Sequence, residues 1–241
     1  MFSHRFDHNV SKTVVFHWFL LCFSGGAINA GGFLATGKFV SHVTGFATLF
    51  GEGLVNNEIK VAFGLLSVPF FFLIGAFIAG LLIDKPLYQN KKPHFDWVMG
   101  LSAMCLFIAM SGGSILNFGT FGETFQLKES YLLLILLCLA SGLQNGAITS
   151  SSGRSIRTTH LTGLTTDLGL GLSRIFTFNL NAENVKSEIR ANYLRLGSIL
   201  SFIAGSAVGS LVFLKFGYKG FAFPALISCY ASWHGYKTKS A

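Results

Sequence analysis

Residues 24–31 read SGGAINAG, and the tetrapeptide HVTG follows at 42–45. Past the middle of the chain, residues 141–147 read SGLQNGA, and HLTG follows at 160–163. In both copies a segment of small and amide-bearing residues ends an apolar run, and an H-x-T-G motif comes after it. A unit that recurs after about half of a 241-residue chain indicates two homologous halves.

The composition is that of a membrane protein. Only 12% of the residues are charged and 51% are apolar, whereas about a quarter of a soluble domain is charged. The charges lie between apolar runs that approach the roughly 20 residues needed to cross a bilayer. The net charge of +8 is spread over short connectors rather than gathered on one face. This distribution favours contact with membrane lipids and predicts no nucleic-acid partner.

The apolar runs predict an all-α membrane protein with six transmembrane helices, three in each half. The expected spans are 13–34, 59–83, 97–116, 131–149, 193–216 and 220–236. The resulting division is an amino-terminal tail at 1–12, a first repeat at 13–116, a connector at 117–130, a second repeat at 131–236 and a tail at 237–241. Residues 36–58 and 150–175 carry the H-x-T-G motifs and are interrupted by polar residues and glycine. Such segments are predicted to re-enter the membrane as broken helices, with a partly buried surface loop as the alternative for the first.

The distribution of Lys and Arg predicts the orientation. With six spans and a cytoplasmic amino terminus, 13 of the 18 basic residues fall on the cytoplasmic side, which the positive-inside rule favours. Both termini are therefore expected in the cytoplasm. Because three spans per half is an odd number, the second half enters from the opposite side, and the halves are predicted to be inverted repeats. The two H-x-T-G motifs are then expected on opposite faces, in an architecture typical of secondary transporters.

Polar groups inside a membrane are costly unless they are partnered, so they are candidates for function. The predicted substrate-binding residues are Asn29, His42, Thr44, Gly45, Gln144, Asn145, His160, Thr162, Gly163 and Asp167. The three amides could contact a polar solute or could satisfy carbonyls where a helix breaks. The two Thr-Gly pairs could begin short helices whose backbone amides face an anion.

The charged and titratable candidates leave further alternatives open. The two histidines could contact a proton or solute, or could serve in packing or capping; no Cys, Asp or Glu accompanies them at metal-ligand spacing, and no metal is predicted. Asp167 could neutralise a coupling cation or proton, or could pair with Arg154, Arg157 or Arg174. The chain has no nucleophile elbow, zinc-protease motif, phosphate-binding loop or dinucleotide fingerprint. The sequence therefore predicts neither an enzyme nor a cofactor.

The chain resembles the YoaK-like family, a domain-of-unknown-function group of bacterial inner-membrane proteins expected to have six helices. The resemblance spans residues 14–236 and rests on two blocks of motifs. They are Gly-Gly-Phe-Leu at 31–34 with Thr44-Gly45, and Gly-Leu-Gln-Asn at 142–145 with Thr-Thr-His-Leu-Thr-Gly at 158–163 and Thr-Asp-Leu-Gly at 166–169. The family usually has Asp where Asn29 stands, Asn where His42 stands and Asn where Phe46 stands. The resemblance implies a multi-pass fold in the bacterial inner membrane, and it implies no substrate.

The favoured hypothesis is a transporter that moves a small polar or ionic solute by alternating access between two inverted repeats. A channel formed by paired re-entrant segments is a second hypothesis. A third is a non-transporting membrane protein, either an assembly partner or a membrane-embedded enzyme. The glycine-rich helix faces could serve a homodimer as well as the internal bundle.

Overall fold

A computed structural model of the chain describes residues 10–113, 115–116, 118–123, 127–153, 156–177 and 182–240. These residues form the helices α1 (Lys12–Thr36), α2 (Val43–Val55), α3 (Ile59–Tyr88), α4 (Phe95–Met110), α5 (Leu127–Ser151), α6 (Leu161–Thr177), α7 (Ala182–Phe216) and α8 (Ala222–Ser240). Short 3₁₀ turns follow α4 at Ser111–Gly113 and α7 at Gly217–Phe221. The described residues contain no strand, so the predicted all-α class is confirmed.

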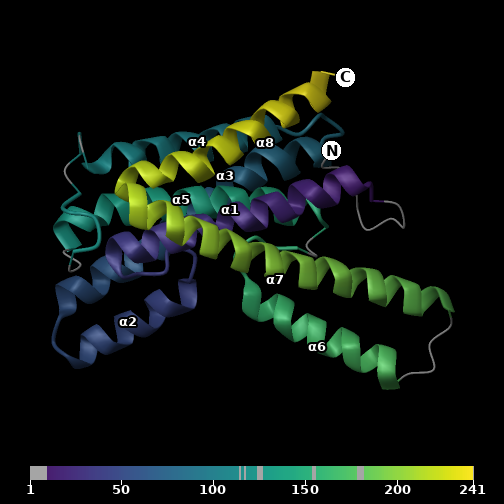
Figure 1. Cartoon of the computed structure of the whole chain (residues 1–241), viewed down its shortest axis with the longest axis horizontal. Helices are drawn as coiled ribbons and strands as arrows, with labels where there is room; N and C mark the ends of the chain where they lie inside the picture. Colours follow the sequence, from purple (N-terminus) through teal and green to yellow (C-terminus); the bar gives the residue numbers. More distant parts are fainter. Residues whose placement is uncertain are drawn as a thin grey trace.

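Most of the helices run along the long axis of the molecule, and α1 begins at the end where α8 finishes (Figure 1). Four helical stretches are long and apolar enough to cross a membrane, namely Lys12–Thr36, Ile59–Tyr88, Ser130–Ser151 and Val185–Thr238. The last stretch contains both α7 and α8, and the chain reverses its direction between them (Figure 1). The apolar helix α4 is shorter, with 16 residues. The chain is therefore a multi-pass membrane protein.

Several helices begin or end up to three turns away from the ends of the predicted spans. The third span was expected to continue to residue 116, but α4 ends at Met110 because Ser-Gly-Gly at 111–113 turns into a 3₁₀ helix. The second span was expected to end at residue 83, but α3 continues to Tyr88 with Pro69 and Pro86 inside it. The fifth was expected to begin at 193, whereas α7 begins at Ala182. Of the predicted amino-terminal tail, residues 1–9 lie outside the described part.

Helices α1 and α5 form the centre of the bundle. In their most apolar windows 61% and 67% of the residues are buried, against 22% in α3 and 22% in the stretch that contains α7 and α8. The outer sides of α3 and α7 carry exposed large apolar side chains. They are Phe63, Phe70 and Phe77 of α3, and Leu211 and Leu214 of α7. Large apolar side chains facing outwards are expected where a helix contacts lipid tails.

Each central helix is crossed closely by one long helix. α1 packs against α7, and α5 packs against α3. A Cβ atom at Gly26 of α1 would collide with the Phe202 carbonyl of α7, and one at Gly142 of α5 would collide with the Phe72 carbonyl of α3. Without side chains at these two glycines, the paired backbones come into direct contact, which is the usual way membrane helices gain packing energy.

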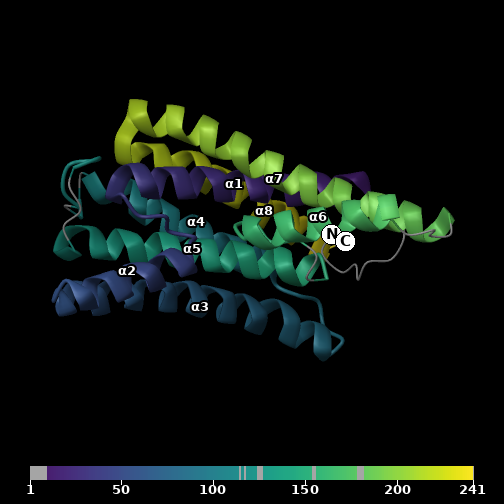
Figure 2. The same ribbon diagram turned by 90° about the horizontal axis from the view of Figure 1, so that it is seen from below.

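The buried apolar residues form two clusters, one towards each end of the bundle. One cluster includes Ile28, Phe46, Leu134 and Phe213. The other includes Trp18, Ile83, Leu143 and Ile148. Figure 2 shows α1 and α5 lying between α7 and α3.

Candidate solute-binding cavity

Each central helix is followed within two residues by a glycine in the left-handed conformation. Gly37 follows α1 with φ of +67°, and its N–H donates to the Phe33 carbonyl over 2.7 Å. Gly153 follows α5 with φ of +59°. Residues with a side chain rarely adopt this conformation, and glycine is the common residue at such helix ends. After each glycine a short connection leads to an H-x-T-G motif and a new helix.

An asparagine holds each connection to the central helix before it. Asn29 Oδ1 accepts hydrogen bonds from the Ser41 hydroxyl at 2.9 Å and the Ser41 N–H at 3.4 Å. Asn145 Oδ1 accepts from the Thr158 N–H at 3.0 Å and the Thr158 hydroxyl at 3.2 Å. We call these two arrangements the asparagine latches. Because a backbone N–H can only donate, the oxygen of each amide must face the connection, which leaves each NH₂ group as a donor for other partners.

The two new helices start near the centre of the molecule and run in opposite directions. In Figure 1, α2 and α6 leave the central region towards opposite ends of the bundle. The first hydrogen bonds within them are Phe46 N–H to the His42 carbonyl and Leu164 N–H to the His160 carbonyl, both at 3.3 Å. The two H-x-T-G motifs therefore form the first turns of α2 and α6.

One cavity of about 730 Å³ brings both motifs together. Its lining includes His42 and Thr44 from the first motif, His160 and Thr162 from the second, and the latch residue Asn145. The expectation that the motifs lie on opposite faces is therefore wrong. Each short helix begins at this cavity, and the two first turns consequently meet there.

The other lining residues add charges and hydroxyl groups. They include Asp84 near the end of α3, Thr149 in the last turn of α5, Arg157 in the connection, and the latch residue Ser41. Among the described residues, no ion pair joins Asp84 or Arg157 to a partner. The Thr149 hydroxyl oxygen is buried and has no hydrogen-bond partner. The cavity therefore presents several polar groups that are free to bind a solute.

Most of the predicted site residues lie at or beside this cavity. His42, Thr44, Asn145, His160 and Thr162 line it. Asn29 is joined to the lining through Ser41, and Gly45 and Gly163 lie within the first turns of α2 and α6.

Two predicted residues lie elsewhere. Gln144 is buried against α4 and α8, where its Nε2 donates to the Ser102 hydroxyl at 3.1 Å and the Ser228 hydroxyl at 3.0 Å. Asp167 is exposed about two turns along α6 and does not line the cavity. The alternative that Asp167 pairs with a nearby arginine is not seen for Arg157 or Arg174, and Arg154 lies outside the described residues.

The sequence interpretation missed Asp84 and Thr149 as cavity residues and considered Arg157 only as a partner of Asp167. Asp84 stands at the end of the second apolar run, where a charge that ends a span is the ordinary interpretation. Thr149 follows Asn145 by four residues, so the two share one helix face. That spacing is a signal from which Thr149 could have been predicted as a cavity residue.

Each short helix is anchored to the long helix that follows it in the chain. Gly53 of α2 packs so closely on Ala62 of α3 that a Cβ added at the glycine would lie 2.9 Å from the alanine Cβ. The rings of Phe50 and Phe63 meet edge to face, with their centroids 5.2 Å apart. The attachment of α2 is therefore apolar.

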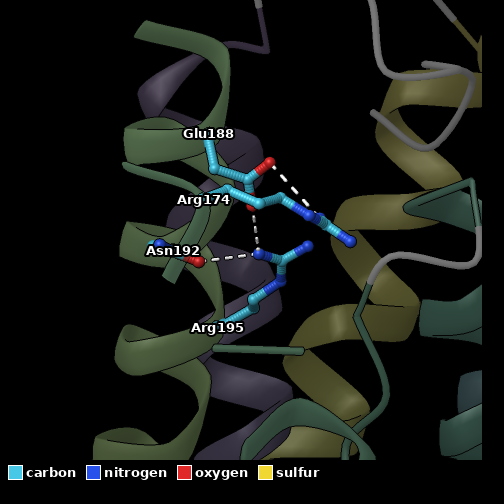
Figure 3. A network of polar contacts seen from close by, with 4 residues as sticks. All are labelled: Arg174, Glu188, Asn192 and Arg195. Atoms are coloured by element: carbon cyan, nitrogen blue, oxygen red, sulfur yellow. Dashed lines mark hydrogen bonds and ion pairs between the residues drawn. The ribbon is translucent and has the colours of Figure 1, made fainter. Parts of the chain in front are cut away.

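The attachment of α6 is polar (Figure 3). Glu188 of α7 accepts from Arg195 at 2.9 Å and from Arg174 of α6 at 3.5 Å, and Arg195 also donates to Asn192 Oδ1 at 2.6 Å. Gly171 of α6 faces this group, where any side chain would collide with it. We call Arg174, Glu188, Asn192 and Arg195 the α6–α7 network.

These features can be compared with known proteins. The sequence profile of a family described as "Protein of unknown function (DUF1275)" matches residues 17–233, which is most of the chain. The chain belongs to the DUF1275 family. It is also 24% identical, over 193 residues, to the UPF0700 transmembrane protein YoaK of Bacillus subtilis (strain 168), and this similarity covers 80% of each chain. No solved structure is significantly similar to it.

The DUF1275 match confirms the resemblance inferred from the sequence motifs. It covers both latches, both H-x-T-G motifs and the whole cavity lining. The YoaK relative is a transmembrane protein by name, which agrees with the apolar helices of this chain.

Proposed function

We propose that this protein is a membrane transporter that moves a small polar or ionic solute through the cavity between the first turns of α2 and α6. The observation that carries this proposal is the convergence of both H-x-T-G motifs on one cavity of about 730 Å³. Its volume lies within the roughly 300–1,000 Å³ of small-molecule sites. Broken helices that begin beside a central cavity are the usual substrate sites of secondary transporters.

We further propose that the two halves are inverted repeats, each with three membrane spans. Contacts between helices support this: the pair α1 and α7 corresponds to the pair α5 and α3, and the pair α2 and α3 corresponds to the pair α6 and α7. The two latches, the two left-handed glycines and the opposite directions of α2 and α6 agree with it. Helix α4 packs on α8, its own counterpart.

We propose the bacterial inner membrane as the location, with both chain ends in the cytoplasm. The excess of Lys and Arg on one side supports this orientation, with 13 of 18 placed there. The common end of α1 and α8 in Figure 1 is consistent with it.

The way the helices are connected supports alternating access. Each short helix is fixed to a long helix of its own half, while that long helix packs against the central helix of the other half. A movement of one half against the other would carry its first turn with it. The cavity would then open to one side and close to the other.

Accessibility of single cysteines tests this proposal. The four native cysteines are replaced, and Thr44→Cys or Thr162→Cys is introduced. Each is exposed to a membrane-impermeant maleimide in right-side-out and in inside-out vesicles. Because both positions line a cavity that opens in turn to each side, we expect each to be labelled from both sides.

Gln144→Cys is the matched control, since this residue is buried outside the cavity and is expected to stay unlabelled. Labelling of both cavity positions from one side only would reject alternating access. A channel is distinguished by flux in proteoliposomes, since a carrier saturates and exchanges solute across the membrane whereas an open pore does neither.

A further inference from the structure

The charges that line the cavity differ in sign and do not balance. Arg157 contributes one full positive charge, and Asp84 is the one carboxylate among the described lining residues. The start of a helix carries roughly half a positive charge, which is concentrated in its first turn. Two helices, of 13 and 17 residues, begin at this cavity. One arginine, one carboxylate and two helix starts therefore leave roughly one excess positive charge at the cavity.

The first turn of α2 leaves backbone donors without partners. His42 occupies the N-cap position and makes no side-chain capping bond. In the described part of the chain, no hydrogen bond is formed by the N–H groups of Val43, Thr44 and Gly45. In the described part of the chain, the N–H groups of Leu161, Thr162 and Gly163 in α6 also form no hydrogen bond. Unpaired donors at a helix start bind anions through hydrogen bonds and through the helix dipole together.

A separate observation at the same cavity is a buried hydroxyl group without a hydrogen-bond partner. The Thr149 hydroxyl oxygen is buried and has no partner, and Thr149 is one of the residues that line the cavity. A threonine within a helix can donate its hydroxyl to the carbonyl four residues before it, as Thr36 does to the Gly32 carbonyl at 2.7 Å. Thr149 makes no such bond. Beside it, the NH₂ group of Asn145 is directed away from the latch and is a further donor for the cavity.

We infer that the solute is a small monovalent anion, such as an oxyanion or a short carboxylate. It is held by the first turns of α2 and α6 together with Arg157, Asn145 and Thr149. This inference rests on the proposed transport function for its biological meaning, but the binding site itself does not require transport. A divalent anion would exceed the single excess positive charge and is disfavoured.

The test measures the thermal stability of the purified full-length protein in detergent, with four probes at equal ionic strength. Sodium nitrate and sodium methanesulfonate are the anions, dimethyl sulfone is the uncharged isostere of methanesulfonate, and tetramethylammonium is the cation. A ligand that binds the folded state raises Tm with its concentration. We expect nitrate and methanesulfonate to raise Tm saturably, and the other two to have no saturable effect.

Arg157→Gln is the central variant, and Lys60→Gln, at an exposed lysine away from the cavity, is its matched control. Arg157→Gln removes a charge-assisted contact, so it should raise the apparent Kd for methanesulfonate roughly tenfold or more. Lys60→Gln should bind like the native protein, which also removes general salt effects from the comparison. If Arg157→Gln does not fold, Thr149→Val replaces it, since this near-isosteric change removes only the unpaired hydroxyl and should weaken binding several-fold.

The outcomes separate this inference from the transport proposal. Equal stabilisation of native protein and variants by the anions, or saturable binding of dimethyl sulfone or tetramethylammonium instead, would overturn the anion site. Labelling of the cavity cysteines from both sides without any anion binding would also overturn the anion site, but it would still support the transport proposal. Anion binding without methanesulfonate flux in proteoliposomes would support the site and reject transport.

Discussion

The break between α1 and α2 and the break between α5 and α6 share their backbone features but differ in chemistry. Both have a left-handed glycine, an asparagine latch and an H-x-T-G first turn. Only the second has an arginine in the cavity and a charged network that holds its short helix, whereas α2 is held by apolar contacts. The comparison teaches that the two breaks share their backbone features, while the arginine of the cavity comes from the second half and its carboxylate, Asp84, from the first. Four predictions test this division.

The largest effect is expected from alanine at the two helix crossings. Gly26→Ala and Gly142→Ala would each place a Cβ against a backbone carbonyl of the crossing helix. We expect each to destabilise the protein by about 1–3 kcal/mol, because backbone cannot move aside as a side chain can. Thermal unfolding in detergent measures this.

Equal losses of folding stability in Gly26→Ala and Gly142→Ala would support the equivalence of the two crossings. A loss of stability in only one of the two variants would contradict that equivalence. Gly51→Ala in α2 is the control, since nothing lies within 4 Å of an added Cβ there. That change should stabilise the helix by up to about 1 kcal/mol.

The latches come next. Asn29→Ala and Asn145→Ala each remove two hydrogen bonds, so each should cost about 1–3 kcal/mol of folding stability. An aspartate keeps the accepting oxygen, and Asn29→Asp and Asn145→Asp should therefore retain much of that stability.

The two aspartate variants should differ in binding. Asn145 lines the cavity and Asn29 does not. Asn145→Asp should therefore weaken methanesulfonate binding more strongly than Asn29→Asp, measured as the apparent Kd in the thermal assay. A larger effect of Asn29→Asp would contradict the assignment of the site.

A smaller and local effect is expected in the α6–α7 network. Glu188→Gln leaves Arg174 and Arg195 without their counter-charge. Because Arg174 is about half exposed and solvent screens its pair, we expect faster hydrogen exchange in 161–177 with little change in the global Tm. Exchange in α2, at 43–55, should not change, since apolar contacts hold that helix; a matching increase there would contradict the comparison.

The smallest effect on stability is expected at the glycines of the two motifs. A Cβ at Gly163 would lie 2.5 Å from His160 Nδ1, whereas one at Gly45 would lie 3.6 Å from the His42 Cβ. Gly163→Ala should therefore displace the His160 ring and weaken anion binding several-fold, with Tm nearly unchanged. Gly45→Ala keeps the backbone N–H that belongs to the proposed anion site and displaces no ring, so it should weaken binding less than Gly163→Ala. Equal effects of both would show that the ring position is unimportant.

The sequence was sufficient for the membrane class, the repeated motifs and the approximate course of the long helices. The apolar runs are long, and their interruptions are strong signals. The ends of α3, α4 and α7 were misplaced because Pro86 was tolerated within a helix, Ser-Gly-Gly ended one early, and the polar start of α7 continues an apolar helix. Periodicity and hydropathy do not predict at which residue such a helix begins or ends.

The cavity was harder to predict, for geometric reasons. Counting spans assigns a motif to a side of the membrane but not to a depth, so the meeting of two first turns was not foreseen. Gln144 and Asn145 are neighbours in sequence, but successive residues of a helix point about 100° apart. Only one of the two can face the cavity, and the other contacts Ser102 and Ser228. Asp84 comes from a different helix, and no local pattern links it to the motifs.

The glycine crossings also have a mechanical consequence. Where α1 meets α7 at Gly26, and α5 meets α3 at Gly142, backbone touches backbone with no side chain between them. Interlocked side chains must change rotamers before two helices can rotate against each other, but these contacts contain none. We expect each crossing to act as a pivot whose position stays fixed while the helices on either side of it swing. Two such pivots, one on each central helix, would define the axis of any rocking motion in this molecule.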